Sequence, residues 1–401
     1  MVVLFVTLVI IMMGFGMVIP VIPFLVEAFG ASGQELGMLM SIYALMQLIF
    51  SPMWGQLSDR FGRRPIMLIG LTGNGLSMLF MGLANSIPML FLARALAGLL
   101  ASATLPTAYA YVGDSTADED RGKGMGILGA AMGVGMVLGP GFSGILAERS
   151  LATPFFAGAA LSLGAIAVVY FMLPESLPQA ARTSAAQINF RQQFNLMWQG
   201  LRGPLGFLLF LAFLTSFGLT NFEGIFGLYM ANRFEYGPRE VGLILTMIGL
   251  ISAAVQGGLT GPATKRFGEV AVVKASLIGS ALGFVLMLWA YNLPTILLTV
   301  GFFVFSNAMI RPGVSSLISR RAEMGQGIAM GLNNSFMSLG RVIGPLTAGM
   351  LFDLDLRLPY LSGALATLIG FVLCLAVLRP EPQFSKSTAI QLSMTDKDHP
   401  G

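Results

Sequence analysis

Apolar runs of about 20 residues recur along the whole chain and are separated by short polar loops. Each run is long enough to cross about 30 Å of hydrocarbon as a helix. Only 10% of the 401 residues are charged, whereas about 25% are charged in an average soluble domain. We therefore predict an all-α integral membrane protein. Twelve transmembrane helices are expected, at residues 2–26, 36–54, 65–84, 87–112, 124–147, 153–173, 206–231, 240–262, 270–291, 294–317, 327–351 and 358–378.

One long polar stretch, residues 174–205, divides the apolar segments into two sets of six. About 30 residues are too few to form a hydrophobic core of their own, so we interpret this stretch as a cytoplasmic linker rather than a small soluble domain. The predicted organisation is a six-helix bundle over 1–173, the linker, a second six-helix bundle over 206–379 and a polar cytoplasmic tail over 380–401.

The two halves resemble each other in sequence. GPGFSGILAERSLATPF (139–155) and GPLTAGMLFDLDLRLPY (344–360) share glycine, leucine and proline positions, and GQLSDRFG (55–62) corresponds to GPATKRFG (261–268). Two parallel six-helix repeats about a central cavity are typical of carriers that work by alternating access. The repeats therefore favour a transporter.

Positive charge is distributed unevenly over the loops. Sixteen Lys and Arg residues lie in or beside the loops on the side of 55–64 and the linker, and only four lie in the opposite loops. By the positive-inside rule, both termini and the linker face the cytoplasm. The formal net charge of +4 is thus an orientation signal, and no nucleic-acid partner is expected. We predict a multi-pass protein of the bacterial cytoplasmic membrane.

Residues that support catalysis are scarce. The single histidine, His399, lies in the tail, the single cysteine, Cys374, lies in the last apolar run, and no Gly-Lys loop that could cradle a phosphate is present. A histidine-based triad and a histidine metal site within the helices are excluded. We expect no enzyme activity, no metal and no cofactor.

Four charged residues lie well inside apolar segments. Glu223 is the only carboxylate among them, and the arginines are Arg94, Arg311 and Arg341. Burial favours the neutral form of a carboxylic acid and a nearby cation favours the charged form, so Glu223 could exchange a proton for a cationic ligand. The alternative is a fixed ion pair with Arg341. A guanidinium in hydrocarbon costs several kcal/mol unless it is paired or faces water, so each arginine should face a cavity or a polar partner; for Arg94, snorkelling to the membrane surface is the alternative.

Two further sets of residues are candidates for substrate binding. At helical spacing, Asn334, Ser338 and Arg341 share one face, which would form a polar stripe that points inward. An aromatic wall for planar ligands could also exist, although each ring could instead pack in the core or face lipid. Its candidate members are Phe222, Phe226, Phe303 and Phe336.

The loop GQLSDRFGRRP (55–65) resembles the signature loop of the major facilitator superfamily. Its glycines allow a tight turn, and Asp59 can interact with a helix N-terminus and with the arginines. The resemblance implies the twelve-helix fold of that superfamily and a conformational latch at the interface between the halves, whereas a plain positive-inside turn is the alternative. The expected latch residues are Gly55, Asp59, Arg60, Gly62, Arg63 and Arg64, with Asp114 and Arg121 from the next loop on that side.

The stretch GAAMGVGMVLGPGFSG (129–144) resembles the antiporter motif of drug–proton exporters in this superfamily. Its glycines would permit close helix packing, and its proline would bend the helix. The resemblance favours export over import, although glycines could simply pack helices in either case. The motif residues are Gly129, Gly133, Gly135, Gly139, Pro140 and Gly144.

Over nearly its whole length the chain most resembles quinolone and multidrug efflux pumps of the NorA type. VIPVIP, LARALAGLLAS (92–102), FGLTNFEGIFGLYM and MIRPG carry the resemblance. It implies export of lipophilic drugs in exchange for protons by a monomer in the lipid bilayer, with Arg94 and Glu223 matching residues that matter in those pumps. Two positions depart: an aspartate of the family falls on Ala308, and an asparagine falls on Arg341. The cavity should therefore favour bulky monocations less than those pumps do.

Other functions stay open at this point. The tetracycline exporters are similar around YALMQLIFSP and DRFGRRP, but their first-span aspartate falls on Ile11. An exporter or flippase for one metabolite or lipid-linked sugar would suit Arg341, which could bind a carboxylate or phosphate. A non-transporting membrane receptor is a remote alternative.

Overall fold

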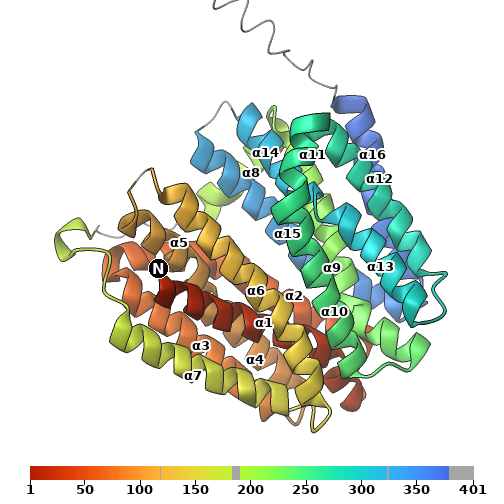
Figure 1. Cartoon of the computed structure of the whole chain (residues 1–401), viewed down its shortest axis with the longest axis horizontal. Coiled ribbons are helices and arrows are strands. Elements are labelled where there is room, and N and C mark those ends of the chain that lie inside the picture. The colour runs from red at the N-terminus through yellow and green to blue at the C-terminus, as the bar shows by residue number, and fades with distance from the viewer. Residues whose placement is uncertain (118, 183–189, 323–324, 379–401) are drawn as a thin grey trace, which may run out of the picture.

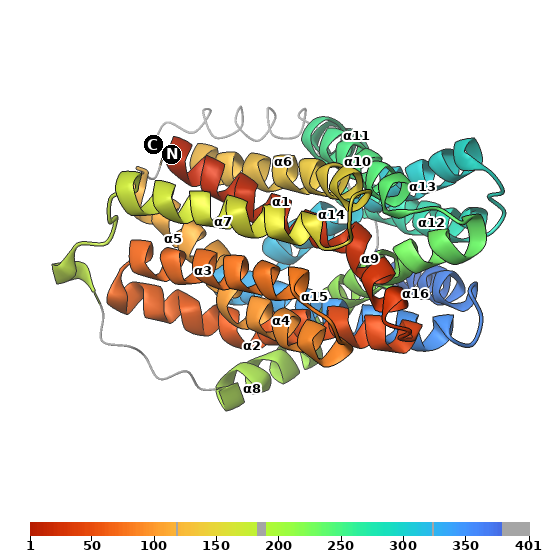
Figure 2. The same cartoon turned by 90° about the horizontal axis from the view of Figure 1, so that it is seen from below.

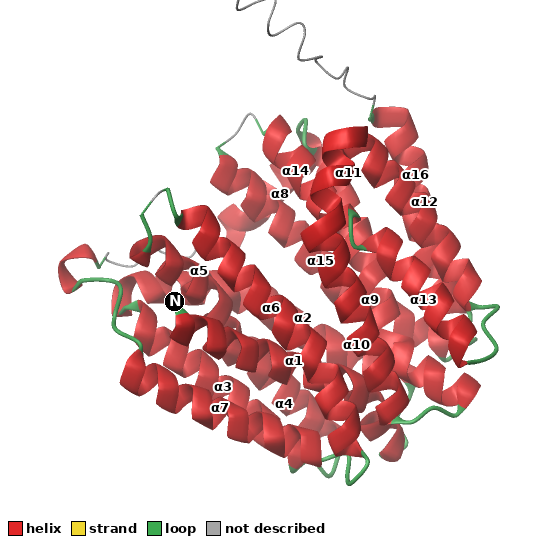
Figure 3. Cartoon of the chain, viewed as in Figure 1, coloured by secondary structure: helices red, strands yellow, loops and turns green. Residues whose placement is uncertain are grey.

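The structure, a computed structural model, describes residues 1–117, 119–182, 190–322 and 325–378. The polar tail with His399 therefore lies outside the described residues, as do Arg379 and part of the linker. The described part is built from helices joined by short loops and contains no strand (Figure 3). Within these residues, twelve helices are long and apolar enough to cross a membrane, which confirms the predicted fold class.

Six spans form each half of the molecule (Figure 1). The N-terminal half contains α1 (Val2–Ala28), α2 (Gly33–Phe61), α3 (Arg63–Gly82), α4 (Ile87–Leu100) continued by η1 (Ala101–Ala103) and α5 (Thr104–Ser115), α6 (Arg121–Ala147) and α7 (Thr153–Met172). The C-terminal half contains α9 (Gly206–Phe234), α10 (Pro238–Ala254) continued by η3 (Val255–Leu259) and α11 (Thr260–Phe267), α12 (Glu269–Met287), α13 (Leu293–Asn307) with α14 (Ile310–Arg321), α15 (Gln326–Phe352) and α16 (Leu358–Val377). Between the halves lie η2 (Gln179–Ala181) and α8 (Phe190–Arg202), and α8 packs against α9 and α15.

Helix boundaries follow local signals. α2 begins after Ser32, whose side chain accepts a hydrogen bond from the backbone of Glu35 while the Glu35 carboxylate bonds back to Ser32. α10, α13 and α16 each begin with a proline in the first turn, where its missing N–H is not needed. The predicted loop 55–64 differs, because α2 stays helical to Phe61 and only Gly62 separates it from α3.

Three predicted spans are irregular in the middle, and prolines explain all three. Pro106, Pro312 and Pro262 have no N–H to bond with the carbonyl four residues earlier. Those carbonyls belong to Ser102 in η1, to Ala308 between α13 and α14, and to Gly258 in the π-helical turn η3. The first two breaks occupy corresponding positions in the two repeats.

We call the end of the molecule that carries Gly62 and Gly268 the inner end, and the end that carries the turns at 29–32 and 353–357 the outer end. The two halves share one hydrophobic core at the outer end. In this core, residues of the N-terminal half such as Val18 and Leu39 pack with residues of the C-terminal half such as Phe222 and Tyr360. Toward the inner end each half has a separate core. The halves are therefore joined at the outer end and separate at the inner end.

The space around the glycines shows the same difference between the outer and inner ends. A side chain at Gly37 would collide with the Pro345 carbonyl, and one at Gly242 would lie 2.5 Å from the Pro140 carbonyl of the other half. Near the inner end, Gly129, Gly257 and Gly331 have nothing within 4 Å of where a side chain would begin. α6 with α10 and α2 with α15 form the main contacts between the halves (Figures 1 and 2).

Candidate functional site

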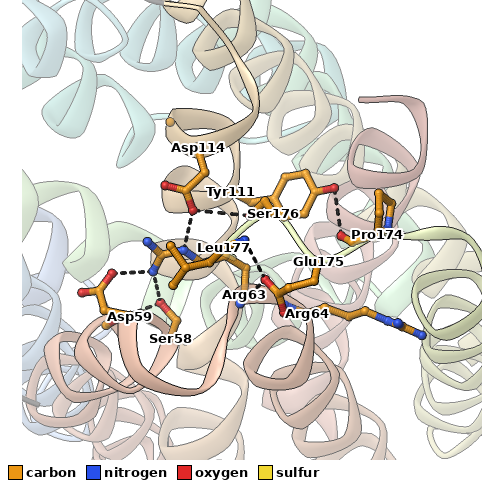
Figure 4. Close-up of polar contacts among 12 residues, drawn as sticks. Ser58, Asp59, Arg63, Arg64, Tyr111, Asp114, Pro174, Glu175, Ser176 and Leu177 are labelled. Atoms are coloured by element: carbon orange, nitrogen blue, oxygen red, sulfur yellow. Dashed lines mark hydrogen bonds and ion pairs between the residues drawn. The ribbon is translucent and has the colours of Figure 1, made fainter. Parts of the chain in front are cut away.

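Arg63 is the centre of the signature-loop network (Figure 4). It is buried, its Nη1 donates to Asp59 Oδ1 at 2.6 Å and to Ser58 Oγ at 2.6 Å, and its Nε donates to Asp114 Oδ2 at 2.8 Å. α2, α3 and α5 are therefore tied together by one guanidinium that two carboxylates share.

Glu175, which the sequence analysis did not identify, closes this network. Its carboxylate accepts hydrogen bonds from the backbone N–H groups of Arg63 at 2.8 Å and Arg64 at 3.2 Å, and so caps the N-terminus of α3 (Figure 4). Gly62 has a φ of 104°, and a side chain there would collide with the Glu175 carboxylate. The only feature of the sequence that marks Glu175 is the Pro-Glu-Ser stretch at 174–176, directly after α7.

The network differs from the expected latch in its position. Asp59 bonds to Arg63 and reaches no helix N-terminus, because Glu175 occupies that of α3. All of these bonds lie within the N-terminal half and the start of the linker, because the two halves are apart at the inner end.

The other expected latch residues have separate contacts. Arg60 lies over the Phe61 ring at 5.1 Å, and Arg121 donates to the Gly113 carbonyl at 3.4 Å. Gly55 lies within α2, facing Pro106.

The residues of the glycine-rich motif of α6 have three kinds of surroundings. Gly135 and Gly139 pack directly on α1, where a side chain would approach Met12 and Met13 to 2.5 Å. Gly144 packs against the start of α10, and the Pro140 carbonyl lies beside Gly242 of that helix. Gly129 and Gly133 face open space near the inner end. Pro140 and Gly144, at the outer end of the motif, therefore join the halves, whereas Gly135 and Gly139 pack within the N-terminal half.

The outer end is also held by polar contacts between the halves. Asp353, after α15, accepts hydrogen bonds from the backbone N–H groups of Gly33 and Gln34 at the start of α2. Glu148, after α6, forms an ion pair of 2.8 Å with Arg239 at the start of α10. Sequence reasoning missed both contacts, because acids at helix ends usually meet only water.

Glu223 lies on α9 where helices from both halves meet. Its neighbour Gly224 packs on Pro345 of α15, and Gly227, one turn further, packs on Pro23 of α1. The Glu223 side chain is half-buried, and no residue in the described part of the chain forms a hydrogen bond or ion pair with it. The fixed ion pair with Arg341 is therefore not formed in this conformation, and the carboxylate is available to a ligand.

Arg341 and Arg311 form the basic surroundings of Glu223. Both guanidinium groups interact electrostatically with the Glu223 carboxylate. Arg341 Nη2 donates to Ser338 Oγ at 3.1 Å and its Nη1 lies 3.5 Å from Gln47 Oε1 of α2. Arg311, in the first turn after the break in its span, is exposed and also interacts with Tyr109 of α5. Two arginines of the C-terminal half therefore surround the carboxylate, and residues of α2 and α5 in the N-terminal half interact with those arginines.

Arg94 is held in the protein interior between α4 and α2. It is 2% exposed, its Nε donates to the Leu39 carbonyl at 3.4 Å, and its guanidinium stacks on the Tyr43 ring at 4.5 Å from the centroid. Snorkelling is therefore not how this arginine is accommodated. Tyr43 also interacts with Arg341, so Arg94 is connected to the Glu223 surroundings through one aromatic ring.

The remaining candidates occupy two kinds of place. Asn334 is exposed on α15, one helical turn from Ser338. Phe222 is buried against Phe226 at 4.9 Å and Phe303 at 5.0 Å between ring centroids. Phe336 is buried in the inner core of the C-terminal half. This placement favours packing, the alternative that the sequence left open, over ligand contact by these rings.

Comparisons with known proteins cover both halves. The sequence matches the Major Facilitator Superfamily over residues 4–222 and again over residues 208–394. It is 34% identical to Multidrug resistance protein 1 of Bacillus subtilis, over 92% of this chain and 93% of that protein. It is 32% identical to the Quinolone resistance protein NorA of Staphylococcus aureus, over 93% of this chain and 95% of that protein.

Two solved structures have a similar fold. The human organic anion transporter MFSD10 matches with a TM-score of 0.70 and 24% identity, over 93% of this chain and 98% of that one. The nucleoside transporter NupG matches with a TM-score of 0.77 and 15% identity, over 95% of this chain and 99% of that one.

Proposed function

Because the chain belongs to the major facilitator superfamily, we propose that it exports lipophilic or amphiphilic drugs in exchange for protons. The relatives named for multidrug and quinolone resistance support the drug substrate. The observation that carries the proton exchange is Glu223, a half-buried carboxylate with no bonded partner among the described residues, where α1, α9 and α15 meet.

The arrangement of the halves supports alternating access. In this conformation the outer end is closed by packed glycines and by the Asp353 and Glu148 contacts, while the inner end is open. A rocking motion of one half against the other would close the inner end and expose the same central site outside. Asp59 has a side chain 48% exposed, so we propose that it meets the C-terminal half only after that closure.

Exchange follows from competition for one carboxylate. A cationic group of the drug enters from the cytoplasm and pairs with ionised Glu223. After the site opens outward, a proton neutralises Glu223 and releases the drug. The protonated carrier returns and loses its proton to the less acidic cytoplasm, where the cationic group of a new drug molecule pairs with the ionised carboxylate. Arg94 would tune the protonation of Glu223 through Tyr43. Both termini would lie in the cytoplasm. One chain supplies both halves, so we propose that a monomer completes the cycle.

The test is dye uptake into everted membrane vesicles from a pump-deficient bacterium that expresses the chain. We expect an imposed pH gradient, acid inside, to drive ethidium accumulation that a protonophore abolishes. Glu223→Gln should lose this accumulation, while Glu27→Gln, at the exposed end of α1, should keep it. Accumulation by Glu223→Gln at the rate of the unmodified chain would rule out the assignment.

A further inference from the structure

The central site contains more positive than negative charge. Arg311 and Arg341 repel each other, and Glu223 is the only carboxylate in the described part of the chain that interacts with them. Arg94 adds a third cation one ring away. Among the described residues, Glu223 therefore offsets only part of this positive charge, and the site can accept an anion.

The present contacts of the two arginines can be displaced. Arg341 contacts only neutral oxygens, those of Ser338 at 3.1 Å and Gln47 at 3.5 Å. Arg311 is exposed and forms no hydrogen bond or ion pair with any residue that the structure describes. The N–H donors of a guanidinium lie in one plane and point in parallel. When they are available, they bind a carboxylate or phosphate through two parallel hydrogen bonds.

Building on the proposed function, we infer that Arg341 and Arg311 bind an acidic group of the substrate while Glu223 binds its basic group. The chain therefore selects zwitterionic amphiphiles over purely cationic ones. Tyr43, whose ring centroid lies 5.5 Å from that of Phe15, and the exposed Tyr109 lie on the facing half. They offer aromatic surface to the body of such a ligand.

A zwitterion also fits proton exchange better than a simple anion. A ligand with only an acidic group would compete with ionised Glu223 for the same arginines. It would then bind best to the protonated carrier, so that proton and ligand would travel in the same direction. With a zwitterion, the basic group occupies ionised Glu223, and the incoming proton displaces it. The acidic group adds affinity and selectivity without reversing this competition.

The test measures binding, so it is independent of transport. The purified chain in lipid nanodiscs is titrated at neutral pH, by fluorescence anisotropy, with a rhodamine free acid and with its methyl ester. The two dyes share one cationic ring system and differ in the carboxylate. Because a lost charge-assisted bidentate contact typically changes affinity by about tenfold or more, we expect the free acid to bind at least that much more tightly.

Variants assign this preference to Arg341. Arg341→Asn should remove the preference by weakening the free acid while leaving the ester unchanged or tighter. Arg341→Lys should keep part of the preference, and Arg149→Gln, in an exposed outer loop, should keep all of it. Equal binding of the two dyes by the unmodified chain would overturn the inference, as would a preference that survives Arg341→Asn. Either result would leave proton-coupled export standing if ethidium is still transported. Binding of neither dye would overturn the inference.

Discussion

The carboxylate of Asp353 accepts hydrogen bonds from the backbone N–H of Gly33 at 2.7 Å and of the following residue, Gln34, at 2.9 Å. This contact caps the N-terminus of α2 with an acid from the other half of the molecule. In the repeat, Glu148 corresponds to Asp353 and Arg239 corresponds to Gln34, and this pair forms the second polar contact at the outer end. The outer end is therefore closed at two positions related by the pseudo-symmetry of the halves.

Asp353→Asn should shift the carrier toward the outward-open conformation. Hydrogen bonds to charged groups contribute about 1.5–3 kcal/mol, so losing the charge and one acceptor should shift the ratio of the two conformations by about tenfold. The readout is maleimide labelling of Gly129→Cys, which faces open space at the inner end, in a Cys374→Ala background. We expect slower labelling after Asp353→Asn.

Glu148→Gln is the matched comparison for that experiment. Its ion pair with Arg239 is about half exposed on both sides, and exposed pairs contribute about 0–1 kcal/mol. We expect a smaller change in labelling than for Asp353→Asn. Unchanged labelling in Asp353→Asn would show that this cap does not hold the outer end closed.

Gly37→Ala should prevent closure of the outer end. The added methyl group would collide with the Pro345 carbonyl in the present conformation, and overpacking typically costs about 1–3 kcal/mol. Gly164→Ala is the control, because nothing lies within 4 Å of that position on α7. We expect transport by Gly37→Ala to fall about tenfold or more, with a normal yield of folded protein. Transport equal to that of Gly164→Ala would contradict the proposed closure.

Glu175→Gln should destabilise the fold rather than alter the substrate site. The substitution removes the charge that caps α3 through Arg63 and Arg64. Lost helix caps typically cost about 0.5–2 kcal/mol. Thermal unfolding of the purified protein should shift to lower temperature, and Glu27→Gln should not shift it. A normal unfolding temperature combined with lost transport would instead indicate a direct role in the cycle.

Arg94→Lys should impair transport although it keeps the positive charge. The guanidinium stacks on Tyr43 and reaches the Leu39 carbonyl, and a lysine ammonium cannot reproduce both contacts. Tyr43→Phe keeps the ring and should transport well, whereas Tyr43→Leu should fall toward Arg94→Lys, because cation–π contacts contribute about 0.5–2 kcal/mol. Initial rates of dye uptake measure the difference. Normal rates in Arg94→Lys would show that charge alone suffices.

Local chemistry could be predicted from the sequence. Apolar runs predict the spans, and the signature loop with the next loop on that side indicates Asp59, Arg63 and Asp114, which the structure brings together. The helix breaks near Ser102 and Ala308 could also be predicted from the sequence, because each lies four residues before a proline. The apolar pattern alone predicts these spans as continuous helices.

Contacts between distant segments could not be predicted in this way. Asp353 and Gly33 are far apart in the chain. Asp353, at the end of α15, caps α2 only because the two halves pack together at the outer end. Phe222 shows the other limit. In a span that is apolar on every side, periodicity does not distinguish a ring that packs against Phe303 from one that would face a cavity.

The most direct test of the central claim uses the purified chain in sealed liposomes with a pH-sensitive dye inside. An imposed ethidium gradient should drive protons in the opposite direction, with no other energy source. In Glu223→Gln, whose neutral amide cannot pair with the cationic dye, neither ethidium transport nor proton movement is expected. Ethidium transport by the unmodified chain with no proton movement, or normal proton movement in Glu223→Gln, would contradict proton-coupled export through Glu223.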